Sequence, residues 1–441
     1  MRDLVVLAIV FAALPVIVFR PYFGLLTYSW LAYMRPQDMA WGMSRVLPLS
    51  QWVALAMVAG IVVTFGRERL ITVKLQTVLL ILLGLWISVT VMTAVLPEMS
   101  QEVYGHYWKG ILMALLTTGL VRDRERFRLL YLLIPFSIGF LGAKRGLFGL
   151  ARGGIQYNDG PGGFMADNNS FAMMLNMMLP LLVGIATTDE RRWVRITAAS
   201  MAALCVPTIL FTFSRGGLLT LCVVSALLIW RSKNRFVVAG LMALALIVFL
   251  AFTSATITDK YLDRASTIDN YQEDGSARGR LNAWKTSWYV FLDYPVFGVG
   301  PNNLAAVFRR YSPEVDRFRV AHNAYFQVLA ESGLPALLLF LGAIGAALWR
   351  MERLRKATAL RWVEIQARML QISIIAYMTG SMFLNTAYNE LIYHLIALTV
   401  CLEVVAHAQS QEATAVPAKA EDVPWWKRPA PAPGLTGMGR I

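Results

Sequence analysis

Three basic side chains beside apolar segments are the residues most suited to chemistry: Arg215, Arg280 and His322. Arg215 belongs to Ser214-Arg215-Gly216-Gly217, between two apolar runs, and its glycines allow close backbone approach at the start of a helix. A guanidinium near hydrocarbon is costly unless an anion or a carbonyl group meets it. This turn therefore indicates an anion site, and an ordinary interfacial anchor is the alternative interpretation.

Arg278 and Arg280 begin a run whose apolar residues recur at helical spacing, namely Leu281, Trp284, Trp288 and Phe291. We expect this segment to lie flat in the headgroup region and to present one or both arginines along the membrane plane. The planar fork of arginine suits bidentate contact with phosphate. A surface helix held only by anionic lipid is the alternative.

His322 begins a predicted helix that continues through Asn323 and Tyr325 and stops at Gly333, with Pro335 beyond. Histidine titrates near neutral pH, so one at a helix start in an aqueous loop is a candidate general base. A structural histidine is the alternative.

A metal site is not expected in the polar stretch that carries Arg280 and His322. Its acidic residues form no Asp-x-Asp pair of the kind that holds Mg²⁺ or Mn²⁺ on a sugar diphosphate. These residues are Asp259, Asp263, Asp269, Glu273, Asp274, Asp293, Glu314 and Asp316. The arginines can neutralise a leaving diphosphate instead. We therefore expect neither a metal nor a cofactor.

The composition places the chain among membrane proteins. Of its 441 residues, 57% are hydrophobic and 15% are charged, against about 25% charged in soluble proteins. The net charge of +14 comes from short clusters between apolar runs, which argues against nucleic-acid binding. Three cysteines in apolar runs predict neither disulfides nor a zinc site: Cys205, Cys222 and Cys401.

The apolar runs predict an all-α polytopic membrane protein with about twelve transmembrane helices and one large periplasmic loop containing short amphipathic helices. The predicted spans are 4–19, 50–66, 74–96, 106–121, 127–143, 169–187, 193–211, 216–230, 236–253, 333–349, 367–384 and 389–407. The first run lacks a cleavage site and is expected to be retained. The stretch 21–34 is short, and we expect it to be interfacial or re-entrant.

Orientation follows from the Lys and Arg residues of the connections. Strongly basic connections occur at 67–74, 122–128, 191–195, 231–235 and 350–356, alternating with less basic ones. We therefore expect both chain ends and these connections in the cytoplasm. Arg215, Arg280 and His322 then share the outer side.

These patterns predict four parts. Residues 1–254 form a bundle of nine spans, 255–332 a periplasmic catalytic loop, 333–408 the last three spans, and 409–441 a disordered cytoplasmic tail.

Three stretches in combination resemble the superfamily of O-antigen ligases and O-antigen polymerases of the bacterial envelope. They are Ser214-Arg215-Gly216-Gly217, Gly279-Arg280 with Trp284 and Pro295-x-x-Gly298-x-Gly300, and His322-Asn323-x-Tyr325 with Glu331-x-Gly333. Gly163-Phe164 through Asn169, Pro180 and the segment from Pro21 to Pro36 are similar to the branch of exosortase-associated O-glycosylation ligases. Ala336 is a departure, since the family often has glycine there.

The resemblance implies an inverting, metal-independent glycosyltransferase of lipopolysaccharide biosynthesis in the bacterial inner membrane. Its donor would be a glycan on undecaprenyl diphosphate at the periplasmic face, and its first candidate acceptor lipid A-core oligosaccharide. Arg215 and Arg280 would hold the diphosphate, and His322 would activate the acceptor hydroxyl or position the donor. Further candidates for substrate binding are Arg278, Asn323, Tyr325 and Asn169.

Two alternatives stay open. The same chemistry can serve a growing glycan, as in a polymerase, or a protein hydroxyl, as in an O-glycosylation ligase. A transporter of the lipid-linked glycan is a different class, and it should carry ionisable groups near the midplane of its spans. Glu403 is the plainest such group, whereas most charge lies at the outer rim.

Overall fold

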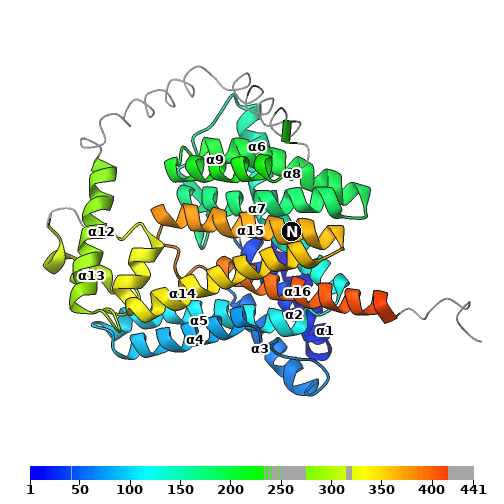
Figure 1. The fold of residues 1–441 in the computed structure, drawn as a ribbon, viewed down its shortest axis with the longest axis horizontal. Coiled ribbons are helices and arrows are strands. Elements are labelled where there is room, and N and C mark those ends of the chain that lie inside the picture. The colour runs from blue at the N-terminus through cyan, green and yellow to red at the C-terminus, as the bar shows by residue number, and fades with distance from the viewer. Residues whose placement is uncertain are drawn as a thin grey trace, which may run out of the picture.

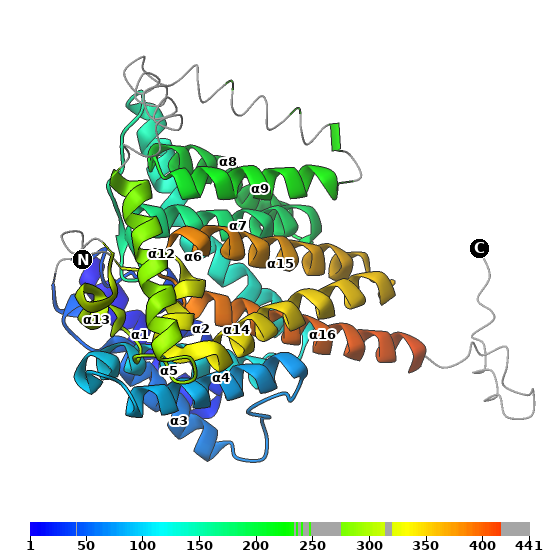
Figure 2. The same ribbon diagram turned by 60° about the vertical axis from the view of Figure 1, so that its left-hand side comes forward.

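The computed structural model describes residues 1–40, 42–232, 235–236, 240, 247, 275–313 and 320–415, which are almost entirely helical. Most long helices run side by side, whereas α12 (Gly275–Asp293) lies across one end of the bundle, with α13 (Leu304–Tyr311) beside it (Figures 1 and 2). We call this the α12 end. Most of the ninth predicted span, the loop residues 255–274 and the tail residues 416–441 lie outside the described residues.

Seven described helices are long and apolar enough to cross a membrane: α1 (Arg2–Phe19), α4 (Leu75–Met92), α6 (Arg124–Ala151), α7 (Asn168–Thr188), α8 (Arg192–Phe211), α14 (Ala324–Ala357) and α16 (Glu390–Ala415). The other bundle helices are shorter or more polar: α2 (Pro21–Tyr33), α3 (Leu49–Val63), α5 (Pro97–Leu120), α9 (Arg215–Trp230) and α15 (Arg361–Gly380). This architecture is that expected of an all-α membrane protein, although the count does not establish twelve spans.

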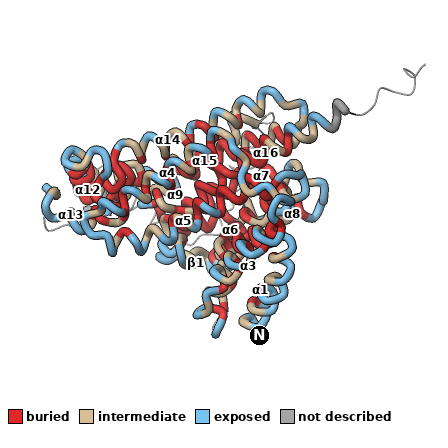
Figure 3. The backbone as a smooth tube through the Cα atoms, turned by 90° about the horizontal axis from the view of Figure 1, so that it is seen from below, coloured by how far each residue is buried: buried red, intermediate tan, exposed pale blue. Residues whose placement is uncertain are grey.

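Short elements connect the long helices. They are the 3₁₀ turns η1 (Met43–Arg45) and η2 (Ser381–Phe383) and the antiparallel strands β1 (Asp159–Gly162) and β2 (Met165–Asp167). Buried residues gather along the middle of the bundle, and α1 is largely exposed at its side (Figure 3). An exposed apolar helix of this kind suits contact with lipid.

Side-chain caps fix where several helices begin. Asp123 caps α6, Asp167 caps α7, Ser214 caps α9 and Asn323 caps α14, each by accepting a hydrogen bond from a backbone N–H of the first turn. Three of these caps, Asp167, Ser214 and Asn323, lie within two residues of positions that the sequence selects for chemistry. Capping therefore sets the position of the candidate site residues.

Helix α2 crosses the bundle, so the interfacial or re-entrant position expected for 21–34 is wrong. At its start Tyr22 donates a hydrogen bond to the carbonyl of Arg126 (2.7 Å), and at its end Tyr33 packs edge-on against Phe164 with 6.0 Å between ring centroids. Thirteen residues extend only about 20 Å. Eight of them are buried, and protein groups meet both ends, so the bilayer length rule does not apply to this helix.

Because α2 crosses, α1 begins at the α12 end. Asp3 accepts a hydrogen bond from the backbone N–H of Ser44 (3.0 Å), in the connection that leads into α3. Figure 2 places the N-terminus on the α12 side, whereas α16 ends at the opposite side. The expectation that both chain ends share one side is therefore wrong, since it depended on leaving 21–34 out of the count.

The described basic connections gather at the end opposite α12, which we call the basic end. Ion pairs join them there: Arg126 with Glu68, Arg128 with Asp189, Arg124 with Glu190, and both Lys74 and Arg350 with Glu403. Glu403, the residue that favoured a transporter, is thus held by two cations at the basic end. These described clusters therefore lie at one end of the bundle, as a shared side requires, and the side of the membrane that this end faces stays a prediction.

Candidate active site

The turn between α8 and α9 holds Arg215 on a fixed backbone. Phe213 has a φ of 53°, and Ser214 Oγ accepts a hydrogen bond from Gly217 N (3.0 Å). Gly217 must be glycine, because a Cβ there would lie 2.7 Å from the Cβ of Ala172 in α7. The side chain of Arg215 is exposed on the first turn of α9. The start of α9 also offers backbone N–H groups suited to an anion.

Arg280 reaches the same turn from α12. It lines a small pocket, the Arg280 pocket, together with Asn169, Met173, Ser214, Gly216, Gly217, Gly380, Phe383 and Leu384. These residues come from four separate parts of the sequence. The structure therefore brings Arg280 and Asn169 to the turn that bears Arg215.

Arg278 is placed differently. Two residues along a helix correspond to a rotation of about 200°, so Arg278 and Arg280 cannot present the same face. Arg278 is exposed, whereas Arg280 is partly buried. The structure thus separates the two arginines and brings only Arg280 to the pocket.

The aromatic face of α12 is divided between protein and surroundings. Trp284 stacks on Phe326 of α14, with 5.8 Å between ring centroids and 17° between planes. Its indole N–H is buried and has no hydrogen-bond partner among the described residues. Apolar side chains of α12 that remain exposed are Leu281, Trp288, Tyr289 and Leu292. Trp284 therefore faces the protein and not the headgroup region, contrary to expectation.

Helix α13 braces the C-terminal end of α12. Tyr311 donates a hydrogen bond to Asp293 Oδ2 (2.6 Å), and this contact raises the pKa of Tyr311 to about 12. Asn282 donates to Ser312 Oγ (2.9 Å), which joins the two elements again near the start of α12. The segment that carries Arg280 is thereby held at both ends.

His322 directly precedes the cap of α14 and has a φ of 46°. Positive φ is uncommon for residues other than glycine, and such residues concentrate at functional sites. Asn323 Oδ1 accepts hydrogen bonds from the backbone N–H groups of Tyr325 (2.9 Å) and Phe326 (3.2 Å). Since Phe326 stacks on Trp284, one turn beyond Arg280, this start of α14 adjoins the arginine-bearing helix.

Tyr325 of α14 contacts the end of α15 and the 3₁₀ turn that follows it. Its hydroxyl donates to the carbonyl of Met378 (2.8 Å) and accepts from Ser381 Oγ (3.3 Å). Ser381 lies in the 3₁₀ turn whose Phe383 lines the Arg280 pocket. The described polar contacts of Tyr325 and the amide oxygen of Asn323 are therefore with the protein, which is a positioning geometry.

A break in α14 explains the glycines of 295–300. Gly333 has φ and ψ of 77° and 179°, and Pro335 has no N–H to continue the helix. Three backbone hydrogen bonds replace those lost at the break: Val299 N to Ala330 O (3.0 Å), Gly300 N to Glu331 O (2.9 Å) and Leu334 N to Pro295 O (2.9 Å). The segment 295–300 thus locks the first turns of α14 in place.

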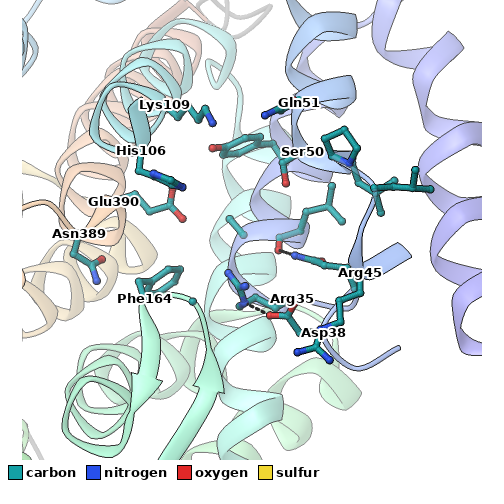
Figure 4. A pocket seen from close by; sticks show the side chains of 18 of the residues that line it. Arg35, Asp38, Arg45, Ser50, Gln51, His106, Lys109, Phe164, Asn389 and Glu390 are labelled. Carbon is teal, nitrogen blue, oxygen red and sulfur yellow. Dashed lines mark hydrogen bonds and ion pairs between the residues drawn. The ribbon is translucent and has the colours of Figure 1, made fainter. Parts of the chain in front are cut away.

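A larger cavity, of about 580 Å³, lies at the same end and was missed by the sequence analysis. We call it the wide cavity, and its charged lining residues are Arg35, Asp38, Arg45, His106, Lys109 and Glu390. Figure 4 shows Lys109 and Glu390 on one side and Arg35 and Arg45 across from them. Lys109 was the available signal, because a cation inside a predicted span, 106–121, is a functional candidate by default.

Comparison with known families divides the chain into two parts. Residues 200–341 match a family model described as O-antigen ligase, and this match contains Arg215, Arg280 and His322. Residues 1–183 match the model of a family of unknown function, and this match contains Arg35, Arg45 and Lys109. No curated protein matches the chain.

Proposed function

Because the chain belongs to the O-antigen ligase superfamily, we propose that it is an inverting, metal-independent glycosyltransferase. It transfers a glycan from undecaprenyl diphosphate to a hydroxyl acceptor at the periplasmic face of the bacterial inner membrane. The observation that carries this proposal is the Arg280 pocket, in which Arg280 of α12 meets the glycine turn of Arg215 and Asn169 of α7.

In this proposal the donor diphosphate binds between Arg280 and the start of α9. Arginine contacts phosphate oxygens with two parallel N–H groups, and the first N–H groups of a helix favour an anion. Arg215 lies on that first turn. As the glycosidic bond to the diphosphate breaks, negative charge grows on the leaving group, and the two guanidinium groups stabilise it.

His322 serves as the general base. The acceptor hydroxyl attacks the anomeric carbon from the side opposite the diphosphate, which forms the new glycosidic bond and inverts the configuration. The hydroxyl proton passes to the imidazole of His322, and undecaprenyl diphosphate is released. Asn323 and Tyr325 position this histidine through the start of α14, and Arg278 is a supporting cation at the surface.

The donor enters from the membrane. Exposed apolar side chains of α12, including Leu281 and Trp288, suit the headgroup region. The basic end then faces the cytoplasm by the positive-inside rule, and the α12 end faces the periplasm. In this orientation a tag before α1 is accessible to an impermeant reagent from the periplasm, and a tag on the chain's C-terminus is not. Equal accessibility of both tags would contradict the orientation.

The proposed reaction has three possible acceptors. Lipid A-core oligosaccharide is the first candidate, and a growing glycan or a protein hydroxyl requires the same chemistry. Purified protein in proteoliposomes would be incubated with glycan-linked undecaprenyl diphosphate and each acceptor in turn. Release of undecaprenyl diphosphate that depends on one acceptor identifies the reaction, whereas movement of intact donor between leaflets without release would indicate a transporter.

A further inference from the structure

The wide cavity is a neighbour of the Arg280 pocket. Two short segments line both: 163–169 contributes Phe164 to the cavity and Asn169 to the pocket, and 384–390 contributes Leu384 to the pocket and Tyr388 to the cavity. Four residues of extended chain span at most about 14 Å. The walls of the two spaces therefore approach within that distance at Leu384 and Tyr388.

The cations of the wide cavity are only partly neutralised. Arg35 pairs with Asp38 at 2.5 Å. Within the part of the chain that the structure describes, neither Arg45 nor Lys109 has a carboxylate within ion-pair distance. Glu390 is the remaining carboxylate in the lining. The cavity consequently has an excess of positive charge, which attracts an anionic ligand.

The remaining lining suits a hydroxyl-rich ligand. Hydrogen-bonding side chains come from Gln37, Ser50, Gln51 and Asn389, and aromatic rings come from Tyr28, Phe164 and Tyr388. Sugars present hydroxyl groups at their edges and C–H groups on their faces, so they match polar and aromatic lining together. The volume of about 580 Å³ falls within the range of about 300–1,000 Å³ typical of small-molecule sites.

We propose that the wide cavity is the acceptor site and binds an anionic saccharide through Arg45 and Lys109, next to the place between Arg280 and the start of α9 where the donor diphosphate binds. This inference rests on the proposed glycosyl transfer, to which it adds the acceptor class and the residues that bind it. In this arrangement the acceptor hydroxyl of the bound saccharide points past Tyr388 and Leu384 toward the donor.

The first test measures saccharide binding without catalysis. The probe is a deacylated, phosphorylated lipid A-core oligosaccharide, titrated by calorimetry into the full-length protein in nanodiscs. Replacing both cations, Arg45→Gln with Lys109→Gln, is expected to raise Kd at least tenfold. The control is Arg309→Gln, an exposed arginine of α13 outside the cavity lining, and it should leave Kd unchanged. Equal affinity in the double variant would overturn the proposal.

A second titration uses the same oligosaccharide probe without its phosphate groups. Dephosphorylation should weaken binding to the unmodified protein by a similar factor and should hardly affect the double variant, because both changes remove the same contact. Ala32→Trp is a second variant that fills the lined space without changing charge, and it should also lower affinity. Displacement of the bound probe by glycerol phosphate alone, at equal strength, would assign the cavity to a lipid headgroup and overturn the proposal.

Donor binding separates failure of this inference from failure of the proposed function. Radiolabelled undecaprenyl diphosphate should bind the Arg45/Lys109 double variant normally and should bind Arg280→Ala poorly. Normal donor binding to Arg280→Ala would contradict the donor site and leave the saccharide titration as an independent measurement. Loss of donor binding in the double variant would overturn the assignment of the cavity to the acceptor.

Discussion

The two ends of the bundle use the same residue types in different ways. At the basic end, the arginines of the connections lie in ion pairs such as Arg126 with Glu68 and Arg350 with Glu403. At the α12 end, Arg45 and Lys109 line a cavity without a carboxylate partner among the described residues. Cations at the basic end therefore stabilise helix ends, whereas those at the α12 end have the surroundings of binding groups.

Backbone conformation shows the same contrast. The described non-glycine residues with positive φ are Arg35, Phe213, Asn302 and His322, and all four lie at the α12 end. Residues with such backbone conformations concentrate at functional sites. The comparison indicates that ion pairs at the basic end stabilise the bundle, and the α12 end is where we propose that the substrates bind.

Two changes at the α12 end have the largest expected effects on transfer, and the first is removal of Arg280 or Arg215. Arg280→Ala and Arg215→Ala should each lower the rate of glycan transfer by about 10²–10³-fold, because each removes charge that stabilises the leaving diphosphate. The rate is measured from released undecaprenyl diphosphate in proteoliposomes. Arg309→Ala, which alters an exposed arginine at the same end, is the control and should retain full activity.

Removal of the imidazole should have an effect of about 10²–10⁴-fold on the rate, with a distinct signature. A general base predicts that the rate of the unmodified protein declines on the acidic side of its pH profile. His322→Ala should lose this decline, while its Kd for undecaprenyl diphosphate stays the same. An unchanged rate in this variant would remove the general-base role. A changed donor Kd at an unchanged pH profile would instead indicate a positioning role.

The break in α14 offers a matched pair of glycines. Gly333→Ala places a Cβ about 1.9 Å from the carbonyl oxygen of Val296 at a φ of 77°, so it should lower both the melting temperature and the transfer rate. A stability loss of about 2 kcal/mol or more is expected from such a clash. Gly345→Ala lies in the same helix with nothing within 4 Å of the new Cβ, and it should be neutral or stabilising. Equal effects of the two substitutions would contradict the role of the segment 295–300 in holding the first turns of α14.

At the basic end, Glu403→Gln should reduce stability and spare catalysis. The Glu403 side chain is 5% exposed, and its partners Lys74 and Arg350 are 30% and 25% exposed. We expect a loss of about 2 kcal/mol, below the roughly 3–5 kcal/mol of a fully buried pair. Thermal unfolding in detergent measures the loss. A selective loss of transfer at full stability would break the division between the two ends.

The sequence predicts features that depend on local hydrophobicity and capping. Long apolar runs correspond to helices such as α4 and α7, and the Ser214 and Asn323 caps lie where the residue types suggest. Membrane sidedness predicts that Arg215, Arg280 and His322 lie on one side, and their convergence on a substrate stays a prediction. Such features can be predicted from the sequence because each depends on a few neighbouring residues.

Features that depend on how distant segments pack together could not be predicted from local sequence patterns. Helix α2 is too short by the bilayer rule, and only its buried contacts with Arg126 and Phe164 reveal that it crosses. Trp284 looks like a headgroup anchor, yet it stacks on Phe326. The wide cavity assembles residues from α2, α5 and α16, whose proximity no local pattern encodes.

The central claim is that separated basic residues converge on one diphosphate at the α12 end. Cryo-electron microscopy of the protein with undecaprenyl diphosphate bound tests it most directly. The account predicts phosphate density within hydrogen-bond distance of Arg280 and of the first turn of α9, with the prenyl chain leaving along the exposed apolar side chains of α12. Density for the diphosphate at the basic end, or away from Arg280, would contradict the account.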